Sequence, residues 1–178
     1  SSLGTALENA RLFAETQRLL KETKARNAEL AVINSIQQGL VAQLDIDAVV
    51  DLVGDKLREV FHSDDLVIVW VDEEAMVLTP AYFYERGIRL TDVAPHPLKP
   101  EGVNGRLLRE RRAVAVNTRA EMSGRPVPGT ALPMSFMRAP VVAAGRVIAL
   151  VNVDNFDREH AFSEGDLRLL ETVSTALG

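Results

Sequence analysis

Four predominantly apolar segments, arranged as two pairs, constrain the possible fold of this chain more than any other feature of its sequence. Residues 66–71 and 76–84 form the first pair; residues 136–142 and 147–153 form the second, joined through residues 143–145. Short apolar runs separated by polar or glycine-containing turns predict β-hairpins. Two hairpins that bury a face predict a single antiparallel sheet, covered on at least one side.

Two amphipathic helices are predicted to cover that sheet. Residues 46–61 place apolar side chains at the i, i+3, i+4 and i+7 positions, with Asp45 or Asp47 as the candidate cap. A last helix begins at Ser163, and its apolar stripe consists of Leu169, Leu170, Val173, Ala176 and Leu177. Both helices need an apolar surface to pack on, and the predicted sheet provides one.

The segment from residue 6 to residue 41 predicts one long helix or two nearly continuous ones, because it has no proline and a single glycine. A heptad seam with several polar members runs along it, formed by Leu12, Thr16, Leu19, Thr23, Arg26, Leu30, Ile33, Gln37 and Leu40. We expect a parallel homodimer of modest stability, joined through Leu12, Leu19, Leu30, Ile33 and Leu40. The alternative is that residues 30–40 lie against their own domain.

The order of elements predicts an α+β fold. A short helix at residues 103–110 and a short strand at residues 113–116 lie between two irregular, proline-containing segments, 86–99 and 120–133. We expect a central antiparallel sheet of five or six strands, with helices packed on one face and a long N-terminal helix. Long irregular segments in compact domains often carry function.

Composition and charge exclude several classes of protein. The formal net charge is −5, so the chain lacks the positive charge that nucleic-acid binding requires. It has no cysteine, which removes disulfides, thiolate metal sites and thiol nucleophiles. No stretch approaches the roughly 20 apolar residues that span a bilayer, and residues 1–18 do not resemble a signal peptide. We expect a cytoplasmic protein without nucleic-acid or membrane contacts.

Three segments carry a resemblance to a known family. Residues 102–108 (GVNGRLL) with 113–117 (AVAVN) form a glycine-punctuated short helix and a strand. Residues 139–141 (APV) with 145–152 (GRVIALVN) form a hairpin, and residues 161–170 (AFSEGDLRLL) form a helix start. In this order, most of the chain resembles a GAF domain. The resemblance implies a GAF-like (PAS-like) sheet and a regulatory, ligand-sensing role in a bacterial multidomain signalling protein.

The resemblance also implies a division of the chain. Residues 28–178 are expected to form the GAF domain, and residues 1–27 a signalling helix that is the tail of a preceding module. In the family, the last helix commonly continues into residues similar to 5–13, whereas this chain stops at residues 175–178. We therefore expect one module of a tandem array. Its parent is expected to be a sensor histidine kinase, with a nucleotide cyclase or a diguanylate cyclase as alternatives.

An arginine within an apolar strand points to the ligand site. A buried cation needs an anion or several acceptors, and Arg138 interrupts such a strand. Because GAF sheets usually look into a pocket beneath their loops, Arg138 is expected to meet an anionic or carbonyl-bearing ligand, with aromatic residues as walls. The expected ligand-binding residues are Arg138, Tyr82, Tyr84, Trp70, His96 and Asn152. The alternative is an arginine at a strand end or sheet edge, bonded to a loop carboxylate.

The cyclic-nucleotide motif of the family is incomplete in this chain. Asn152, Phe162 and Asp166 match it, but the residues after Asn152 and Asp166 are valine and leucine, where the motif has lysine and glutamate. Ser163 and Asp166 instead fit a capping box, with Phe162 as a hydrophobic staple. We therefore predict a helix start at this position and not a cyclic-nucleotide site.

No catalytic or metal site is predicted, and no cofactor is identified. His62, His96 and His160 lack ligand spacing on one element, and the common hydrolase, zinc-peptidase and nucleotide-binding motifs are absent from the sequence. The enzymatic GAF branch that reduces free methionine sulfoxide relies on cysteines, which this chain lacks. Two functions stay open: a regulatory sensor whose ligand biases the long helices, and a pocketless module for dimerisation and relay.

Overall fold

The chain folds around one antiparallel sheet. The structure is a computed structural model that describes residues 2–41 and 46–178, the side chains of residues 38–41 excepted. The strands are β1 (Leu66–Asp72), β2 (Val77–Glu85), β3 (Ile88–Arg89), β4 (His96–Pro97), β5 (Val114–Val116), β6 (Ser135–Ala143) and β7 (Arg146–Asn155). Their order is β3-β2-β1-β7-β6-β5, and β4 also pairs with β2. The predicted α+β fold is confirmed; the two-residue strands β3 and β4 bring the sheet to seven strands within the described residues.

The two predicted hairpins lie side by side in this sheet. β1 pairs with β2, β6 pairs with β7, and the pairing of β1 with β7 joins the hairpins, with Val67 opposite Asn152. The register shifts at two places, between Ile68 and Val69 on β1 and between Val141 and Val142 on β6. Each irregularity resets the alternation of side chains between the two faces of the sheet.

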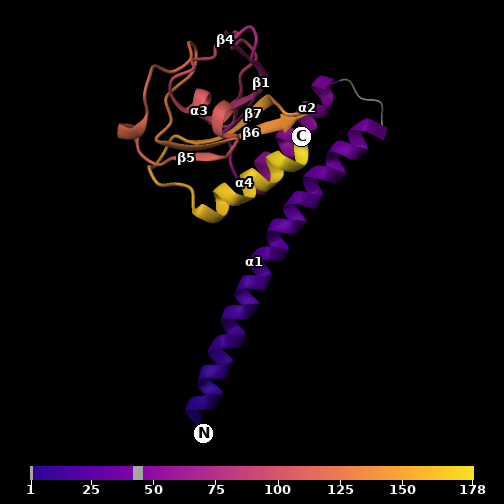
Figure 1. The fold of residues 1–178 in the computed structure, drawn as a ribbon, viewed down its shortest axis with the longest axis vertical. Coiled ribbons are helices and arrows are strands. Elements are labelled where there is room, and N and C mark those ends of the chain that lie inside the picture. Colours follow the sequence, from indigo (N-terminus) through magenta and orange to yellow (C-terminus); the bar gives the residue numbers. More distant parts are fainter. Residues whose placement is uncertain (1, 42–45) are drawn as a thin grey trace.

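Helices cover one face of the sheet, which we name the helix-covered face (Figure 1). α2 (Ile46–Phe61) and α4 (Glu164–Leu177) lie on the sheet, and the last part of α1 (Ser2–Val41) packs against both of them. The core between these layers includes Leu57 from α2, Met137 and Val151 from the sheet and Leu170 from α4, all buried. These apolar contacts explain why α2 and α4 show the amphipathic periodicity that predicts them.

The opposite face, which we name the loop-covered face, lies beneath α3 (Val103–Glu110) and the irregular segments around it. Leu98 and Leu107 pack there in a second buried cluster with Val69 and other sheet residues. Gly105 lets α3 approach the preceding segment closely, because a Cβ at this position would lie 1.8 Å from the carbonyl oxygen of Pro100. The short turn η1 (Arg119–Glu121) follows β5.

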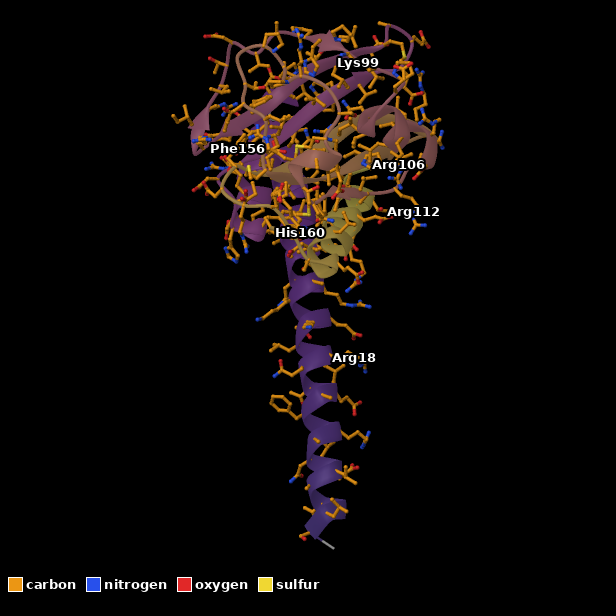
Figure 2. The ribbon with its side chains drawn as sticks, turned by 90° about the vertical axis from the view of Figure 1, so that its left-hand side faces the viewer. Arg18, Lys99, Arg106, Arg112, Phe156 and His160 are labelled. Carbon is orange, nitrogen blue, oxygen red and sulfur yellow. The ribbon has the colours of Figure 1, made fainter. Side chains whose placement is uncertain are left out.

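The long helix α1 extends far from the sheet, as Figure 1 shows, and confirms the prediction of an extended N-terminal helix. Figure 2 shows Arg18 on the part of α1 that stands clear of the sheet. Near its end, Val32 is fully buried against the domain, so residues 30–40 do lie partly on their own domain. Leu30, however, is 54% exposed. The side chain of Leu40 is outside the described part of the chain.

The ends of the helices follow local chemistry. α4 has the predicted capping box: Ser163 Oγ accepts a hydrogen bond from the Asp166 amide at 3.1 Å, and the Asp166 carboxylate accepts one from the Ser163 amide at 2.7 Å. α2 has Asp47 in its first turn, whereas Asp45, the other candidate cap, is not among the described residues. None of the described helices has an apolar stretch long enough to cross a bilayer.

Candidate functional site

Arg138 lies on β6 and contacts the elements that cover the loop-covered face. Its Nη1 donates a hydrogen bond to Oδ1 of Asn104 on α3, and its guanidinium carbon lies 4.7 Å from the centre of the Phe136 ring. Its Nε is buried and has no hydrogen-bond partner in the described chain. The alternative of an edge arginine bonded to a loop carboxylate is wrong, because β6 is an interior strand and the partner is an amide.

Asn152 stands next to Arg138 on the neighbouring strand. The two residues are directly opposite each other in the β6–β7 ladder, so their side chains leave the same face of the sheet. Asn152 is 8% exposed, and its Oδ1 is buried without a hydrogen-bond partner among the residues described. A buried polar atom that lacks a partner costs about 1–3 kcal/mol. The structure thus brings two of the expected ligand-binding residues together, one with an unpaired donor and the other with an unpaired acceptor.

Asp154 adds a carboxylate to this face. It stands opposite Phe136 in the same ladder, two residues beyond Asn152. Burial raises the pKa of Asp154 to about 7, although the nearby guanidinium of Arg138 favours the carboxylate; Asp65 and Glu85 add to the rise. Burial likewise lowers the pKa of Arg138, and the charge of Asp154 opposes that change. The two groups therefore influence each other on the loop-covered face.

Two of these residues are absent from the prediction made from sequence. Asp154 follows Asn152 by two positions in an apolar strand, and this spacing is a signal that places both side chains on one face. Asn104 has no comparable signal, because an irregular segment carries α3 to its place over the sheet. We name Arg138, Asn104, Asn152 and Asp154 the polar cluster.

The three aromatic residues expected in the same site lie on the other side of the sheet. Tyr82 belongs to the core of the helix-covered face, and Trp70 and Tyr84 pack against that core. The sheet itself separates them from Arg138. The expectation that they form the walls of one pocket with Arg138 is therefore corrected.

Tyr82 and Tyr84 instead connect β2 to α2 through side-chain contacts. The Tyr82 ring packs on the backbone of α2 at Gly54, where a Cβ would lie 2.5 Å from the ring, and its hydroxyl donates to Asp55 at 2.7 Å. The guanidinium of Arg58 lies 3.9 Å from the centre of the Tyr84 ring. Burial, reinforced by the hydrogen bond to Asp55, raises the pKa of Tyr82. This arrangement joins the sheet to the helix that packs on α1.

The three histidines lie at separate places in the structure. His96 stands in β4 opposite Leu78, a residue of the buried cluster on the loop-covered face, and its Nδ1 lies 3.3 Å from the carbonyl oxygen of Ala94. His62 and His160 are exposed. Across residues 2–41 and 46–178, no group of three or more His, Cys, Asp or Glu side chains is placed to hold a metal ion. His96 thus shares a face with the polar cluster without a hydrogen bond to its described members.

Two hollows of about 160 Å³ each open on the surface of the molecule. One lies at the outer edge of β2 and is lined by Tyr82, Arg89 and Val93, among others. The second lies between the end of α2, the end of β7 and the start of α4, and Asp154 and Phe162 contribute to its lining. Arg138 lines neither hollow and is held by Asn104 of α3, whereas Asp154, at the other end of the polar cluster, lines the second hollow.

A family model decides what this chain is related to. The model of the GAF domain matches residues 43–178, which include the whole sheet, α2, α3, α4 and the polar cluster. This chain belongs to the GAF domain family. The identification from three short segments is confirmed, whereas the division of the chain at residue 27 stays a prediction.

Solved structures show the same fold for this GAF domain. The GAF domain of an Acinetobacter phosphoenolpyruvate-protein phosphotransferase superposes with a TM-score of 0.64 at 20% identity, covering 85% of this chain and 90% of that one. A methyl-accepting chemotaxis protein superposes with a TM-score of 0.64 at 18% identity, covering 82% of this chain and 92% of that one. A free methionine-R-sulfoxide reductase from Neisseria meningitidis, in complex with its substrate, has a TM-score of 0.61 at 19% identity, covering 90% and 87%. At these identities the likeness shows the fold alone.

Domains of this fold therefore occur both in a sensory protein and in enzymes. A search of curated protein sequences gives no match to this GAF domain. The residues of its incomplete cyclic-nucleotide motif are divided between two roles. Ser163 and Asp166 form the capping box of α4 and Phe162 packs against the core, which confirms the predicted helix start, while Asn152 belongs to the polar cluster.

Proposed function

We propose that this GAF domain is a regulatory small-molecule sensor of a bacterial signalling protein in the cytoplasm. The polar cluster carries the proposal, because the half-buried Arg138 and the buried Asn152 stand side by side, each with one buried polar atom that lacks a described partner. Buried polar groups are almost always hydrogen-bonded, so unpaired ones require an explanation. A small molecule on the loop-covered face supplies the missing partners.

The sheet offers a route from the polar cluster to the helices. Met137 and Val153 alternate with the cluster residues along β6 and β7, and they pack in the core of the helix-covered face together with Val32 of α1. A ligand that shifts these strands changes the surface on which α1 rests. It biases the output only if it binds two arrangements with different affinity.

The long helix is the proposed connection to the rest of the signalling protein. We assign residues 1–27 to a signalling helix from a preceding module and residues 28–178 to the GAF domain. Two copies are proposed to pair in parallel through the seam, since Leu12, Leu19 and Leu30 are about half exposed. Ile33 and Leu40 complete the seam. The proposed output domain is a histidine kinase, with a nucleotide cyclase or a diguanylate cyclase as alternatives.

A pocketless relay module is the second candidate. Asn104 already holds Nη1 of Arg138, and the two surface hollows do not reach that arginine, which favours a cluster that only fixes α3 to the sheet. In this function the domain spaces its neighbours and dimerises without a ligand. Neither candidate involves catalysis, for which the cysteine-free sequence offers no nucleophilic thiol.

Native mass spectrometry and a thermal-shift screen with nucleotides, organic acids and amino acids test the sensor. We expect a bound mass or a higher melting temperature for the natural sequence, lost in Arg138→Gln. A ligand at 100 times its Kd stabilises the folded state by about 2.7 kcal/mol, which the screen resolves. If no compound binds, the relay module is the better description.

Light scattering across a range of concentrations tests the dimer. We expect the natural sequence to dimerise and the double variant Leu12→Glu, Leu19→Glu to be monomeric, because two charges enter the apolar seam. Leu7→Glu is the matched control, since Leu7 is 64% exposed on the same helix but outside the seam. A natural sequence that stays monomeric at every concentration contradicts the dimer.

A further inference from the structure

The free edge of the Arg138 guanidinium has a definite chemistry. Asn104 accepts a hydrogen bond from Nη1 and so holds the group in one orientation. Nε is buried and unpaired, and Nη2 donates to no described residue. The N–H groups on Nε and Nη2 are parallel and coplanar, and their spacing matches the two oxygens of a carboxylate. A carboxylate therefore fits this edge better than a single carbonyl oxygen.

The neighbouring strand presents acceptors. Oδ1 of Asn152 is unpaired and stands directly across the ladder from Arg138. Asp154 follows on the same face, close enough to interact electrostatically with Arg138 but forming no ion pair with it in the described chain. A carbonyl oxygen beside a carboxylate suits an ammonium group, which has three donors and a positive charge. Directly opposite Cβ atoms are about 5 Å apart, so both sets lie within the span of one small molecule. Because neither hollow reaches Arg138, a ligand that contacts both sets has to displace part of the cover above that arginine.

We propose that the polar cluster binds a small zwitterionic amino acid, whose carboxylate pairs with Arg138 and whose ammonium group pairs with Asn152 and Asp154. This inference rests on the proposed sensor function and names the ligand class of the same site. Asn104 is a positioning residue that orients the guanidinium.

The charges of the cluster favour a zwitterion over other ligands. The cluster contains one cation, Arg138, and one carboxylate, Asp154. A nucleotide phosphate brings at least one negative charge without a compensating cation, and a dicarboxylate places its second anion near Asp154, where like charges repel. A zwitterion matches both charges and leaves no buried charge unpaired.

Calorimetric titration of the full chain with each protein amino acid tests the ligand class. The titrations are carried out at about pH 8, where Asp154 is ionised. We expect at least one amino acid to bind, and its analogue that lacks the ammonium group, such as propionate for alanine, to bind at least about 10-fold more weakly. The amide analogue, which lacks the carboxylate, is expected to lose affinity similarly. These ligand analogues test the proposal on the unmodified protein, whatever the stability of any variant.

Two substitutions test which side chain binds the carboxylate of the ligand and which binds its ammonium group. Arg138→Lys keeps the charge but removes the coplanar donors, and we expect it to weaken amino-acid binding about 30-fold. Asp154→Asn is expected to weaken amino-acid binding about 10-fold while leaving the weak binding of propionate unchanged. Arg168→Lys on the exposed face of α4 and the exposed Asp92→Asn are the matched controls, expected to change neither affinity.

The outcomes separate this inference from the sensor function. If nucleotides or organic acids bind through Arg138 and amino acids do not, the zwitterion is wrong and the sensor stands. If amino acids bind equally well to Asp154→Asn and to the natural sequence, the assignment of the ammonium group is wrong. If nothing binds, both proposals fail.

Discussion

The two faces of the sheet use the same strands for different purposes. On the helix-covered face, β6 and β7 present only apolar residues to the core: Met137, Ala139 and Val141 from β6, and Ala149, Val151 and Val153 from β7. On the loop-covered face, the intervening positions include Arg138, Asn152 and Asp154. Helices cover the first face, and a short helix with irregular segments covers the second.

This difference indicates that one face of the sheet mainly stabilises the fold and that the other is suited to ligand binding. The strand residues of the helix-covered face gain free energy from burial, and the unpaired buried atoms on that side, Arg58 Nε and Ser174 Oγ, belong to the covering helices α2 and α4 and not to the strands. The loop-covered face bears the cost of unpaired polar atoms, which natural proteins retain chiefly where function requires them. The helix-covered face is therefore expected to dominate folding, and the loop-covered face to respond to ligands and pH.

Truncation of the helix-covered core should have the largest effect. Leu170 on α4 is fully buried, and Leu170→Ala is expected to lower the free energy of unfolding by about 3–4 kcal/mol, because it removes packed atoms and leaves a cavity. Urea denaturation measures the change. Leu20→Ala is the matched control on an exposed part of α1, expected to cost less than about 0.5 kcal/mol. Equal effects at the two leucines contradict a core centred on this face.

Substitution at the close contact between Gly105 of α3 and the Pro100 carbonyl is expected to have the next largest effect on stability. Gly105→Ala places a methyl group 1.8 Å from the Pro100 carbonyl oxygen, so backbone must move, at a cost of about 2–3 kcal/mol. Chemical denaturation again measures the loss. Gly165→Ala, where a Cβ lies 3.5 Å from Ser163 Oγ, is the control and is expected to be neutral or slightly stabilising. A harmless Gly105→Ala contradicts the close approach of α3.

The polar cluster should make stability depend on pH. The pKa of Asp154 is about 7 in the folded state and near its ordinary value of 3.8 in the unfolded state. Between about pH 4 and pH 7 the folded state therefore holds more protons, and the free energy of unfolding falls as pH rises. Asp154→Asn removes this contribution.

Urea denaturation at one pH inside this window and at one pH above it measures the effect. We expect the stability of Asp154→Asn relative to the natural sequence to increase by about 2–3 kcal/mol from about pH 5 to about pH 8. Asp92→Asn, at an exposed position, controls for the loss of a carboxylate. A relative stability that does not change with pH contradicts a buried Asp154.

Loss of the Tyr82 hydroxyl on the helix-covered face is expected to have the smallest effect on the free energy of unfolding. Tyr82→Phe removes the hydrogen bond to Asp55 but keeps the ring against Gly54, so the free energy of unfolding is expected to fall by about 1 kcal/mol. The exposed Asp55 regains water as a partner, which limits the loss. A loss of several kcal/mol instead indicates that the hydroxyl, and not the ring, holds β2 to α2.

Much of the fold could be predicted because its signals are local. The apolar alternation of residues 66–84 and 136–153 records a buried face in each strand, and the Ser163 and Asp166 pair marks a helix start without reference to the rest of the chain. The polar cluster was predicted in part. Arg138 and Asn152 are found together, but Asp154 and Asn104 complete the cluster and were missed.

The placement of the aromatic residues shows why the site was harder to predict. Tyr82 and Arg138 lie on different hairpins, and their relative faces depend on the register of β1 with both β2 and β7. A shift of one residue in any ladder turns a side chain to the other face. Tyr82 pairs with Ile68, Ile68 with Val151, and Val151 with Ala139 beside Arg138, and no local pattern in the sequence marks these pairings.

The sequence by itself determined the main helices and strands, because periodicity and capping act over a few residues, and three segments that resemble GAF domains indicated the family. Only the tertiary structure decided which face each strand residue joins, and that Asn104 meets Arg138. Those choices depend on ladder register and on a loop crossing between segments 34 residues apart, where many side chains act together.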